Sequence, residues 1–378
     1  MQPVVFRSAL VMAAVVMLAG AADATIWSVN PGDSIQTAIN NAIGGDTINV
    51  AAGTYTENLA LDKAVSVVGL AGWTGTVLNG TANLGDGATL QGFTVGTATE
   101  GAYVSGDGAT IDGCWIESSG TNAVTHTIQI YPGSGAADVT IRNSTIRTNT
   151  MGKAAVYVET FAMLDGLTLE GNTIIGDYGV TQSFGALNTV IRDNTFTGLA
   201  GATKRGIQIK TSMDNVLIEG NDITGFDMGI RLDSNLTELG AGPVVITGNT
   251  IWDNASENVR LKRAPGVQMT WNEFSQSTAA PNVYVYGDYA DLDVDFINHN
   301  NILGDVGIQN DSTTTVDATC NWWGDATGPT HVSNPGGLGA AVSDYVDYGC
   351  YLAQPIPEPA TLSLLALGGL ALVRRRRT

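Results

Sequence analysis

Basic and tyrosine side chains recur at one position of a short repeated motif in the middle of this 378-residue chain. The motif alternates apolar and polar residues, as in Gly206–Lys210 and Asn258–Lys262, and returns in eight steps between Tyr103 and Gln309, about every 26 residues. Strict alternation places the polar positions on one face of a strand. In chain order, these positions hold Tyr103, Gln129, Tyr131, Tyr157, Glu159, Thr181, Gln208, Lys210, Arg231, Asp233, Arg260, Lys262, Tyr284, Tyr286 and Gln309.

Side chains of these types can bind an extended acidic polysaccharide. Tyrosine rings pack against sugar faces, while arginine and lysine pair with carboxylate or sulfate groups. If successive copies stack about 4.8 Å apart, the positions form a stripe about 38 Å long. The alternative is a strand face that binds no ligand and only contacts solvent, with charge pairs that contribute little to stability.

A second motif with the same period indicates how the stripe is built. It reads apolar, x, apolar, two turn residues, Asn, small, apolar, as in Leu169–Ile174, Ile191–Phe196, Ile218–Ile223 and Ile246–Ile251. Two motifs with one period predict a coil that contains at least two short strands. Stacked coils bury ladders of Ile, Val and Leu, and the repeated Asn can form a hydrogen-bonded ladder at a turn. An all-β sandwich is the alternative, but it does not require two motifs in register.

The ends of such a solenoid need caps, because an open coil is an unpaired strand edge. Residues 33–43 predict a helix with Asp33 as N-cap and an apolar stripe that includes Ile39 and Ile43. At the other end, Trp322 and Trp323 are expected to plug the core. The stripe of the helix comprises Ile35, Ala38, Ile39, Ala42 and Ile43.

The three cysteines fall in two contexts. Cys320 and Cys350 flank the closing segment, and a disulfide between them would stabilise the fold by roughly 3–4 kcal/mol. The free and the bonded form both remain open. Cys114 stands in the Asn position of the repeat and is expected to be a small buried filler.

These coils resemble the right-handed parallel β-helix of the pectin-lyase-like superfamily over about residues 28–352. Residues 45–58 resemble the family's opening coil, and Asn321–Pro329 resembles a closing motif. The resemblance implies an all-β solenoid of about ten coils, and the enzymes of this fold carry active sites on a strand face.

For a polysaccharide lyase, the resemblance implies that Arg or Lys abstracts a proton beside a uronate carboxylate, helped by another cation or by Ca²⁺. The candidates are Lys210, Arg231, Arg260 and Lys262, with Asp233 and Glu159 as metal or orienting groups. The remaining stripe residues, Tyr103, Gln129, Tyr131, Tyr157, Gln208, Tyr284 and Tyr286, are expected to bind substrate.

The sequence departs from several enzyme families of this fold. The Asn-Thr-Asp, Asp-Asp and Gly-His-Gly motifs of its glycosidases are absent, as is the Asp-Pro-His-Asp signature of uronan epimerases. His126, His299 and His331 lack metal-ligand spacing. Asp291, Asp293 and Asp295 would share one side of a strand, which suggests either weak Ca²⁺ binding or, preferably, a solvated face.

Both ends of the chain have the pattern of export signals. Residues 1–24 predict a signal peptide that signal peptidase removes. Pro357-Glu358-Pro359, an apolar run and four arginines resemble the PEP-CTERM sorting signal, which implies cleavage by an exosortase after transient membrane association. A plain membrane anchor is the alternative. The predicted domains are therefore a signal peptide (1–24), a β-helix (25–352), and a linker with the sorting signal (353–378).

Composition narrows the function further. A net charge of −19 argues against nucleic-acid binding, which requires a basic surface. We therefore expect a secreted, cell-surface β-helix that binds or organises acidic polysaccharide. The alternatives are a polysaccharide lyase or related carbohydrate-active enzyme, and a purely structural surface protein.

Overall fold

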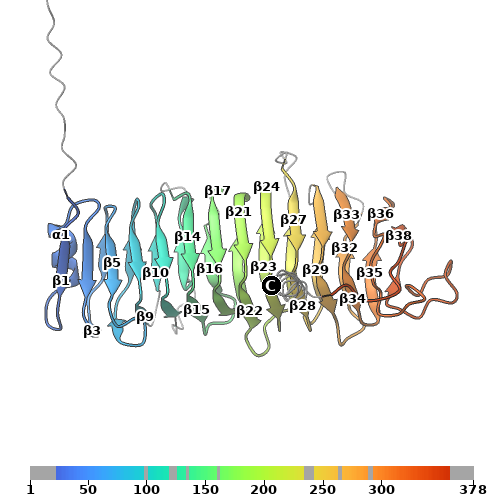
Figure 1. Cartoon of the computed structure of the whole chain (residues 1–378), viewed down its shortest axis with the longest axis horizontal. Coiled ribbons are helices and arrows are strands. Elements are labelled where there is room, and N and C mark those ends of the chain that lie inside the picture. The colour runs from blue at the N-terminus through green and yellow to red at the C-terminus, as the bar shows by residue number, and fades with distance from the viewer. Residues whose placement is uncertain are drawn as a thin grey trace, which may run out of the picture.

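The computed structural model describes residues 23–97, 101–118, 126–132, 136–159, 162–233, 242–262, 266–287 and 293–357. The predicted signal peptide, apart from Asp23 and Ala24, and the apolar and arginine-rich tail lie outside these ranges. The described residues form a right-handed parallel β-helix in which successive coils stack along one axis (Figure 1). The prediction of an all-β solenoid of about ten coils is confirmed.

Each regular coil contributes one strand to each of three parallel sheets, one more than the two repeated motifs require. Sheet A contains β1 (Ile26–Val29), β2 (Thr47–Val50), β5 (Ser66–Gly69), β8 (Thr89–Gln91), β11 (Thr110–Asp112), β14 (Val139–Arg142), β17 (Leu164–Asp165), β18 (Leu167–Glu170), β21 (Ala186–Arg192), β24 (Met213–Glu219), β27 (Val244–Thr247), β30 (Val267–Thr270) and β33 (Val294–Asn298).

Sheet B follows sheet A in each coil. It contains β3 (Gly53–Tyr55), β6 (Thr76–Leu78), β9 (Thr94–Thr97), β12 (Trp115–Ser118), β15 (Thr145–Thr148), β19 (Thr173–Gly176), β22 (Thr195–Gly198), β25 (Asp222–Thr224), β28 (Thr250–Trp252), β31 (Glu273–Ser275) and β34 (Asn301–Leu303).

Sheet C completes the coil. It contains β4 (Leu59–Leu61), β7 (Ala82–Leu84), β10 (Ala102–Val104), β13 (Ile128–Ile130), β16 (Ala154–Val158), β20 (Tyr178–Gln182), β23 (Arg205–Lys210), β26 (Met228–Asp233), β29 (Glu257–Lys262), β32 (Pro281–Val285), β35 (Val306–Asn310) and β37 (Ala341–Val342). A separate pair, β36 (Val316–Asp317) and β38 (Val346–Asp347), closes the C-terminal end.

The core consists of aligned apolar side chains, because alternate strand residues point inward in every coil. One such ladder in sheet A is fully buried and comprises Ile111, Ile141, Leu169, Ile191, Ile218, Ile246, Met269 and Ile297.

The repeated Asn forms the predicted ladder at the corner between sheets A and B. Asn172, Asn194, Asn221, Asn249, Asn272, Asn300 and Asn321 are all buried. Each backbone N–H donates to the side-chain carbonyl of the next member, 21 to 28 residues further along the chain. Cys114 occupies the same column, as predicted, and burial raises the pKa of its thiol to about 12.

The residue before each ladder position has a left-handed backbone conformation. The φ angles are 62° at Gly220, 64° at Gly248 and 59° at Trp271. This conformation turns the chain sharply from sheet A to sheet B, and Gly or Asn adopts it at little cost. Side chains in this column point outward from the corner between sheets A and B.

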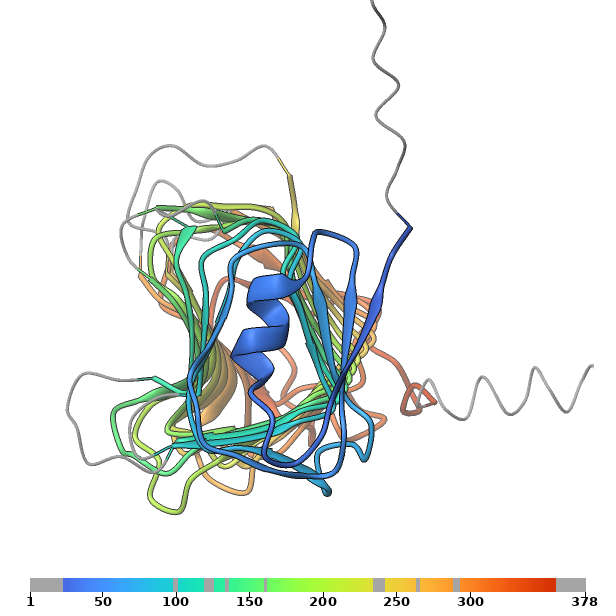
Figure 2. The same ribbon diagram turned by 90° about the vertical axis from the view of Figure 1, so that its left-hand side faces the viewer.

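Both ends of the solenoid are capped. Helix α1 (Ile35–Asn41) lies across the first coil and packs Ile35 and Ile39 on the core (Figure 2). The N-cap is Ser34, whose hydroxyl accepts from the Thr37 N–H, so the assignment of Asp33 was wrong. Ile43 lies beyond the helix and is exposed, which also differs from the expected apolar stripe.

The C-terminal end is closed by the segment that follows β34. Trp323 is fully buried and plugs the last coil, whereas Trp322 is only half-buried and forms a bridge with Asn301. Within the described ranges, α1 is the single helix, and none is long and apolar enough to cross a membrane.

Candidate functional site

The predicted stripe forms one continuous column on the outer face of sheet C. The strand register aligns Tyr103, Gln129, Tyr157, Thr181, Gln208, Arg231, Arg260, Tyr284 and Gln309 on successive rungs. A second aligned series contains Lys210, Asp233 and Lys262, and Tyr286 follows on the next strand. The period of the sequence therefore identified the correct neighbours.

The centre of this column is a group of cations, which we call the basic cluster: Arg205, Lys210, Arg231, Arg260 and Lys262. Arg231 Nη2 pairs with Asp233 Oδ2 at 2.5 Å, and Lys262 Nζ lies 3.6 Å from Asp233 Oδ1. Arg260 pairs with Glu257. Both carboxylates are buried, whereas the arginine side chains retain about a fifth of their exposure. Two carboxylates thus neutralise only part of the charge of the five cations, and the basic cluster has a net positive charge.

Lys210 differs from the other members of the basic cluster. Its side-chain amine makes no hydrogen bond or ion pair within the described ranges. Partial burial lowers the pKa of the Lys210 amine, and the nearby Arg231 and Arg205 guanidinium groups lower it further, while Asp233 acts in the opposite direction. Lys210 therefore releases its proton more readily than an exposed lysine does.

Several buried polar atoms in this region have no hydrogen-bond partner within the described part of the chain. They include Arg231 Nε, Arg260 Nε, Gln208 Oε1 and Thr181 Oγ1. Buried polar groups are normally hydrogen-bonded, because an unmade bond costs about 1–3 kcal/mol. These atoms are enclosed by the protein, so a ligand on this face would contact the exposed parts of the Arg231 and Arg260 side chains, about a fifth of each, and not these atoms.

Aromatic rings flank the basic cluster on both sides. On the C-terminal side, the Arg260 guanidinium lies 5.3 Å from the Tyr284 ring and 5.7 Å from the Tyr286 ring. The Tyr284 hydroxyl donates to Asp311 Oδ2 at 2.6 Å, and burial together with this bond raises the pKa of Tyr284 to about 12. This end is a packed network of rings and charges.

The N-terminal side holds two stacked ring pairs. Tyr103 stacks on Tyr131 with centroids 5.8 Å apart, and Tyr157 stacks on His126 at 4.0 Å. A ring face packed on another ring is not available to a sugar. Tyr103 also lies five rungs from Arg231, about 24 Å along the axis, so these residues and the basic cluster would contact different units of one long ligand.

Glu159, the second predicted orienting group, is not part of the basic cluster. It lies two rungs before Lys210, and no ion pair joins it to a cation in the described ranges. Conversely, the sequence analysis missed Glu257, the partner of Arg260. The only signal for it was an acidic residue three positions before Arg260 in the same motif.

The two thiols of the closing segment lie side by side. The Cys320 N–H donates to Gly349 O, so Cys320 and Cys350 occupy neighbouring rungs. Both are free thiols here, and a hydrogen bond with Cys350 is the main cause that raises the pKa of Cys320.

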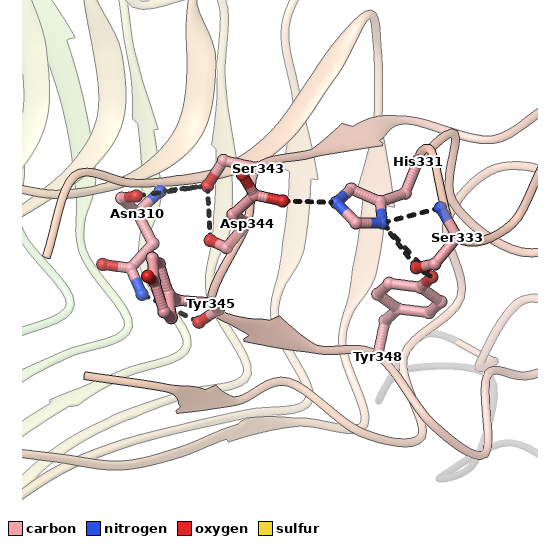
Figure 3. Close-up of polar contacts among 7 residues, drawn as sticks. All are labelled: Asn310, His331, Ser333, Ser343, Asp344, Tyr345 and Tyr348. Atoms are coloured by element: carbon pink, nitrogen blue, oxygen red, sulfur yellow. Dashed lines mark hydrogen bonds and ion pairs between the residues drawn. The ribbon is translucent and has the colours of Figure 1, made fainter. Parts of the chain in front are cut away.

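A further polar network lies in the same closing segment (Figure 3). His331 Nδ1 lies 2.7 Å from Ser333 Oγ, and His331 Nε2 lies 3.3 Å from Asp344 Oδ1. The Ser333 hydroxyl oxygen also lies 2.5 Å from the Tyr348 hydroxyl oxygen, and the Ser333 N–H donates to His331 Nδ1. This network fastens the segment around His331 to Asp344 and Tyr348, which lie on either side of β38.

Comparison with known proteins gives the family. The family described as "Periplasmic copper-binding protein (NosD)" matches residues 39–293. The chain belongs to the NosD family. The PEP-CTERM protein-sorting motif matches residues 355–377 of this NosD-family chain, which is therefore an exported protein of the cell envelope or surface. No curated protein shows significant similarity to it.

Several solved structures share the fold of this NosD-family chain. The A-module of Azotobacter vinelandii mannuronan C-5 epimerase AlgE4 is 17% identical, with a TM-score of 0.58 over 86% of this chain and 93% of that one. The AlgE6 A-module is 16% identical, with a TM-score of 0.51 over 85% and 94%. Pectate lyase Pel9A is 15% identical, with a TM-score of 0.48 over 80% and 81%. At these identities, the similarity shows the fold alone.

The copper in the family name can be tested against the donors of this chain. Copper sites use converging His, Cys or Met side chains. In the described ranges, no three His, Cys, Asp or Glu residues converge. His126, His299 and His331 lie in separate coils and are engaged with Tyr157, Trp271 and Asp344. These residues do not form a copper site.

The predicted acidic triplet is only partly described, since Asp291 lies outside the described residues. Asp295 lies in β33 and accepts a hydrogen bond from Gln268 Nε2, whereas Asp293 precedes the strand. The described pair does not form a cluster of Ca²⁺ ligands.

Proposed function

We propose that this protein binds acidic polysaccharide along the outer face of sheet C at the cell surface. The observation that carries the proposal is the basic cluster, which concentrates five cations on adjacent rungs of a chain with a net charge of −19. A strongly acidic protein gains nothing in solubility from such a concentration. Binding of an anionic polymer would explain why these cations are concentrated on one face.

The spacing of the rungs suits an extended ligand. Cations repeat along the axis at about 4.8 Å per rung, and each can pair with one of the charges along a polymer. Arg231 and Arg260 pair with Asp233 and Glu257, and about a fifth of each arginine side chain stays exposed, so the guanidinium groups can also donate to a ligand. Such charge-assisted hydrogen bonds contribute about 1.5–3 kcal/mol each.

A polyuronate is the first ligand to test. The AlgE4 and AlgE6 modules are named as mannuronan C-5 epimerases, and mannuronan is a polymer of uronate units. Those names only guide the choice of ligand. The sorting motif supports exosortase as the partner during export, and an exported protein of the cell envelope or surface can meet extracellular polymers.

The decisive experiment measures binding of the full chain to mannuronan by calorimetry. Arg231→Gln combined with Arg260→Gln should weaken binding at least about tenfold, which corresponds to about 1.4 kcal/mol, and binding should weaken as salt rises. The matched control is Arg142→Gln with Arg192→Gln, which removes two salt-bridged arginines from sheet A. No binding, or equal weakening by both pairs, would overturn the proposal.

Lyase activity is the second candidate function, and Lys210 is the observation that favours it. Arginine stays protonated in proteins, so Arg231 and Arg260 cannot act as bases. Lys210, with its lowered pKa, can take the C5 proton beside a uronate carboxylate while Arg231 and Arg260 stabilise the developing charge. The glycosidic C4–O4 bond then breaks as the C4=C5 double bond forms, and the departing oxygen takes a proton from water. Unsaturated products would absorb in the ultraviolet.

Lys210→Ala separates the two functions. If the protein is a lyase, this variant should abolish product formation and leave most of the binding intact. If the protein only binds, the wild-type chain yields no product with mannuronan, polyguluronate or polygalacturonate. A chain that neither binds nor cleaves these polymers would leave a structural role.

A further inference from the structure

A pocket of about 310 Å³ lies outside the Asn ladder, on the corner between sheets A and B. This corner joins the two sheets other than sheet C, so the pocket is separate from the basic cluster. Small-molecule sites typically measure about 300–1,000 Å³. The pocket is therefore large enough for one small polar ligand or one unit of a polymer.

The pocket exists because two side chains are missing from the left-handed column. The register places Asp193, Gly220, Gly248 and Trp271 on four successive rungs of this column. Both glycines expose bare backbone between the two flanking side chains. A Cβ atom at Gly248 would meet only the Gly220 nitrogen, at 3.8 Å, so the space above Gly248 is open.

Trp271 forms one wall of the pocket. Its side chain is 47% exposed, and one ring face stacks on His299, with centroids 5.7 Å apart. His299 lies on the rung after Trp271, whereas Gly248 lies on the rung before it. The other face of the indole is therefore turned toward the gap, where it can pack against a ligand.

The end of the described chain forms another wall. The Ile356 N–H donates to Asn301 Oδ1 at 2.8 Å, and Asn301 Nδ2 donates to Ile356 O at 2.9 Å. This reciprocal pair holds Ile356 and Pro357 against the corner. The pocket thus combines an aromatic face, an apolar wall and bare backbone.

The polar groups in the pocket select the charge of the ligand. Asp193 and Glu273 contribute carboxylates, and Thr250 contributes a hydroxyl, whereas no lysine or arginine is among the described residues that line the pocket. Neither carboxylate makes a hydrogen bond or ion pair within the described ranges. Carboxylates accept hydrogen bonds from hydroxyl groups and repel anions, so a uronate or phosphate is disfavoured.

We propose that this pocket binds an uncharged pyranose unit of a glycan. A pyranose ring has an apolar face, which packs on the free face of Trp271, and hydroxyl donors at its rim, which Asp193 and Glu273 accept. This site and the proposed basic face of sheet C take different ligands, one neutral and the other anionic. One molecule then joins an acidic polymer on one face to a neutral glycan on the A–B corner.

The test measures binding of the full chain to cellohexaose, laminarihexaose and mannohexaose by calorimetry and tryptophan fluorescence. At least one of these neutral hexaoses should bind to the wild-type chain. Gly248→Asn fills the gap with a residue that tolerates positive φ, and Trp271→Asn removes the indole. Each variant should weaken binding at least about tenfold.

The matched control is Gly113→Asn. Gly113 occupies the same left-handed column with φ 59°, and a Cβ atom there meets nothing within 4 Å, but it lies away from the pocket. This variant should bind as the wild type does, and thermal unfolding should verify that all three variants fold. Absence of neutral-hexaose binding at millimolar concentration, or unchanged binding in Gly248→Asn, would overturn the inference.

The outcome is independent of the proposed function. Mannuronan binding should respond to Arg231→Gln and Arg260→Gln and should not respond to Gly248→Asn. Failure at one site therefore leaves the result at the other unaffected.

Discussion

Arg231 Nη2 lies 2.5 Å from Asp233 Oδ2, and the two residues project from the same strand, β26. Lys262, on the neighbouring strand β29, approaches the other oxygen of the same carboxylate. One buried carboxylate therefore holds two cations of the basic cluster in place. We therefore expect Asp233 to stabilise this face of sheet C and to lower its affinity for anions.

Asp233→Asn should shift that balance in a measurable way. The change leaves Arg231 and Lys262 without their buried counter-charge, so the free energy of unfolding should fall by about 2–3 kcal/mol. The same change raises the positive charge of the face, so affinity for mannuronan should increase. Urea unfolding and calorimetry measure the two effects.

Asp112→Asn is the control for this variant. Asp112 pairs with the exposed Arg142 on sheet A, so its loss should cost less than about 1 kcal/mol and leave mannuronan binding unchanged. A fall in mannuronan affinity in Asp233→Asn, with the fold intact, would contradict the role assigned to the carboxylate.

The Asn ladder should be sensitive at every buried member. In Asn221→Ala, the N–H and the side-chain amide of Asn194 lose their acceptor, and the Ile191 carbonyl loses its donor. Each unmade buried bond costs about 1–3 kcal/mol, so we expect a loss of at least about 3 kcal/mol in chemical unfolding. Asn221→Ser should cost less, because Ser144 occupies the same column in an earlier coil. Equal losses in both variants would show that the ladder bonds are not the cause.

His126 predicts a specific dependence of stability on pH. Burial, and to a smaller extent the charge of Lys153, lower the pKa of its imidazole to about 4 from an ordinary value of 6.5. The folded state thus stays neutral where the unfolded chain binds a proton. Stability should therefore fall by about 2–3 kcal/mol as the pH drops from 6.5 to 4, and this contribution should then level off.

His126→Gln isolates this contribution. Glutamine can still accept the hydrogen bond that His126 Nδ1 receives from the Ala154 N–H, but it does not titrate. The difference in stability between wild type and variant should shrink toward pH 4. Parallel stability curves from pH 7 to pH 4 would rule out a role for the imidazole.

Cys320 and Cys350 should form a disulfide when the protein is oxidised. Neighbouring rungs place Cα atoms about 4.8 Å apart, within the range that a disulfide spans. Closing a loop of about 30 residues should raise stability by about 3–4 kcal/mol. Thiol titration should find two reactive groups in the reduced native protein and none after oxidation.

Cys114 and Cys350→Ser provide the internal controls. Cys114 is buried with a pKa of about 12, so it should react only after unfolding. Cys350→Ser should show no stabilisation under oxidising conditions. Two reactive thiols that persist in the oxidised wild type would contradict the pairing.

The sequence predicted sheets A and C because many of their strands, such as β24 and β26, repeat two or more inward apolar residues. Sheet B escaped notice because its strands are shorter. In β25, for example, Ile223 is the only buried residue of three, and one residue shows no alternation. A pattern of period two cannot reveal a strand with a single inward side chain.

The order of the site residues on successive coils was predictable, but the contacts between side chains within one strand were not. The recurring strand motif places Gln208, Arg231, Arg260 and Tyr284 in one column, even though the coils between them differ in length. The pairing of Arg260 with Glu257 depends on side-chain directions within one strand, which the period does not determine. The corner pocket was invisible for another reason, since it arises where Gly220 and Gly248 contribute no side chain.

The reciprocal bonds between Ile356 and Asn301 also fix where the sorting motif begins on the molecule. The motif begins at residue 355, and the bonded residues lie on the one corner of the coil that sheet C does not adjoin. The last described residues are therefore fastened to the side of the solenoid, away from its cationic face.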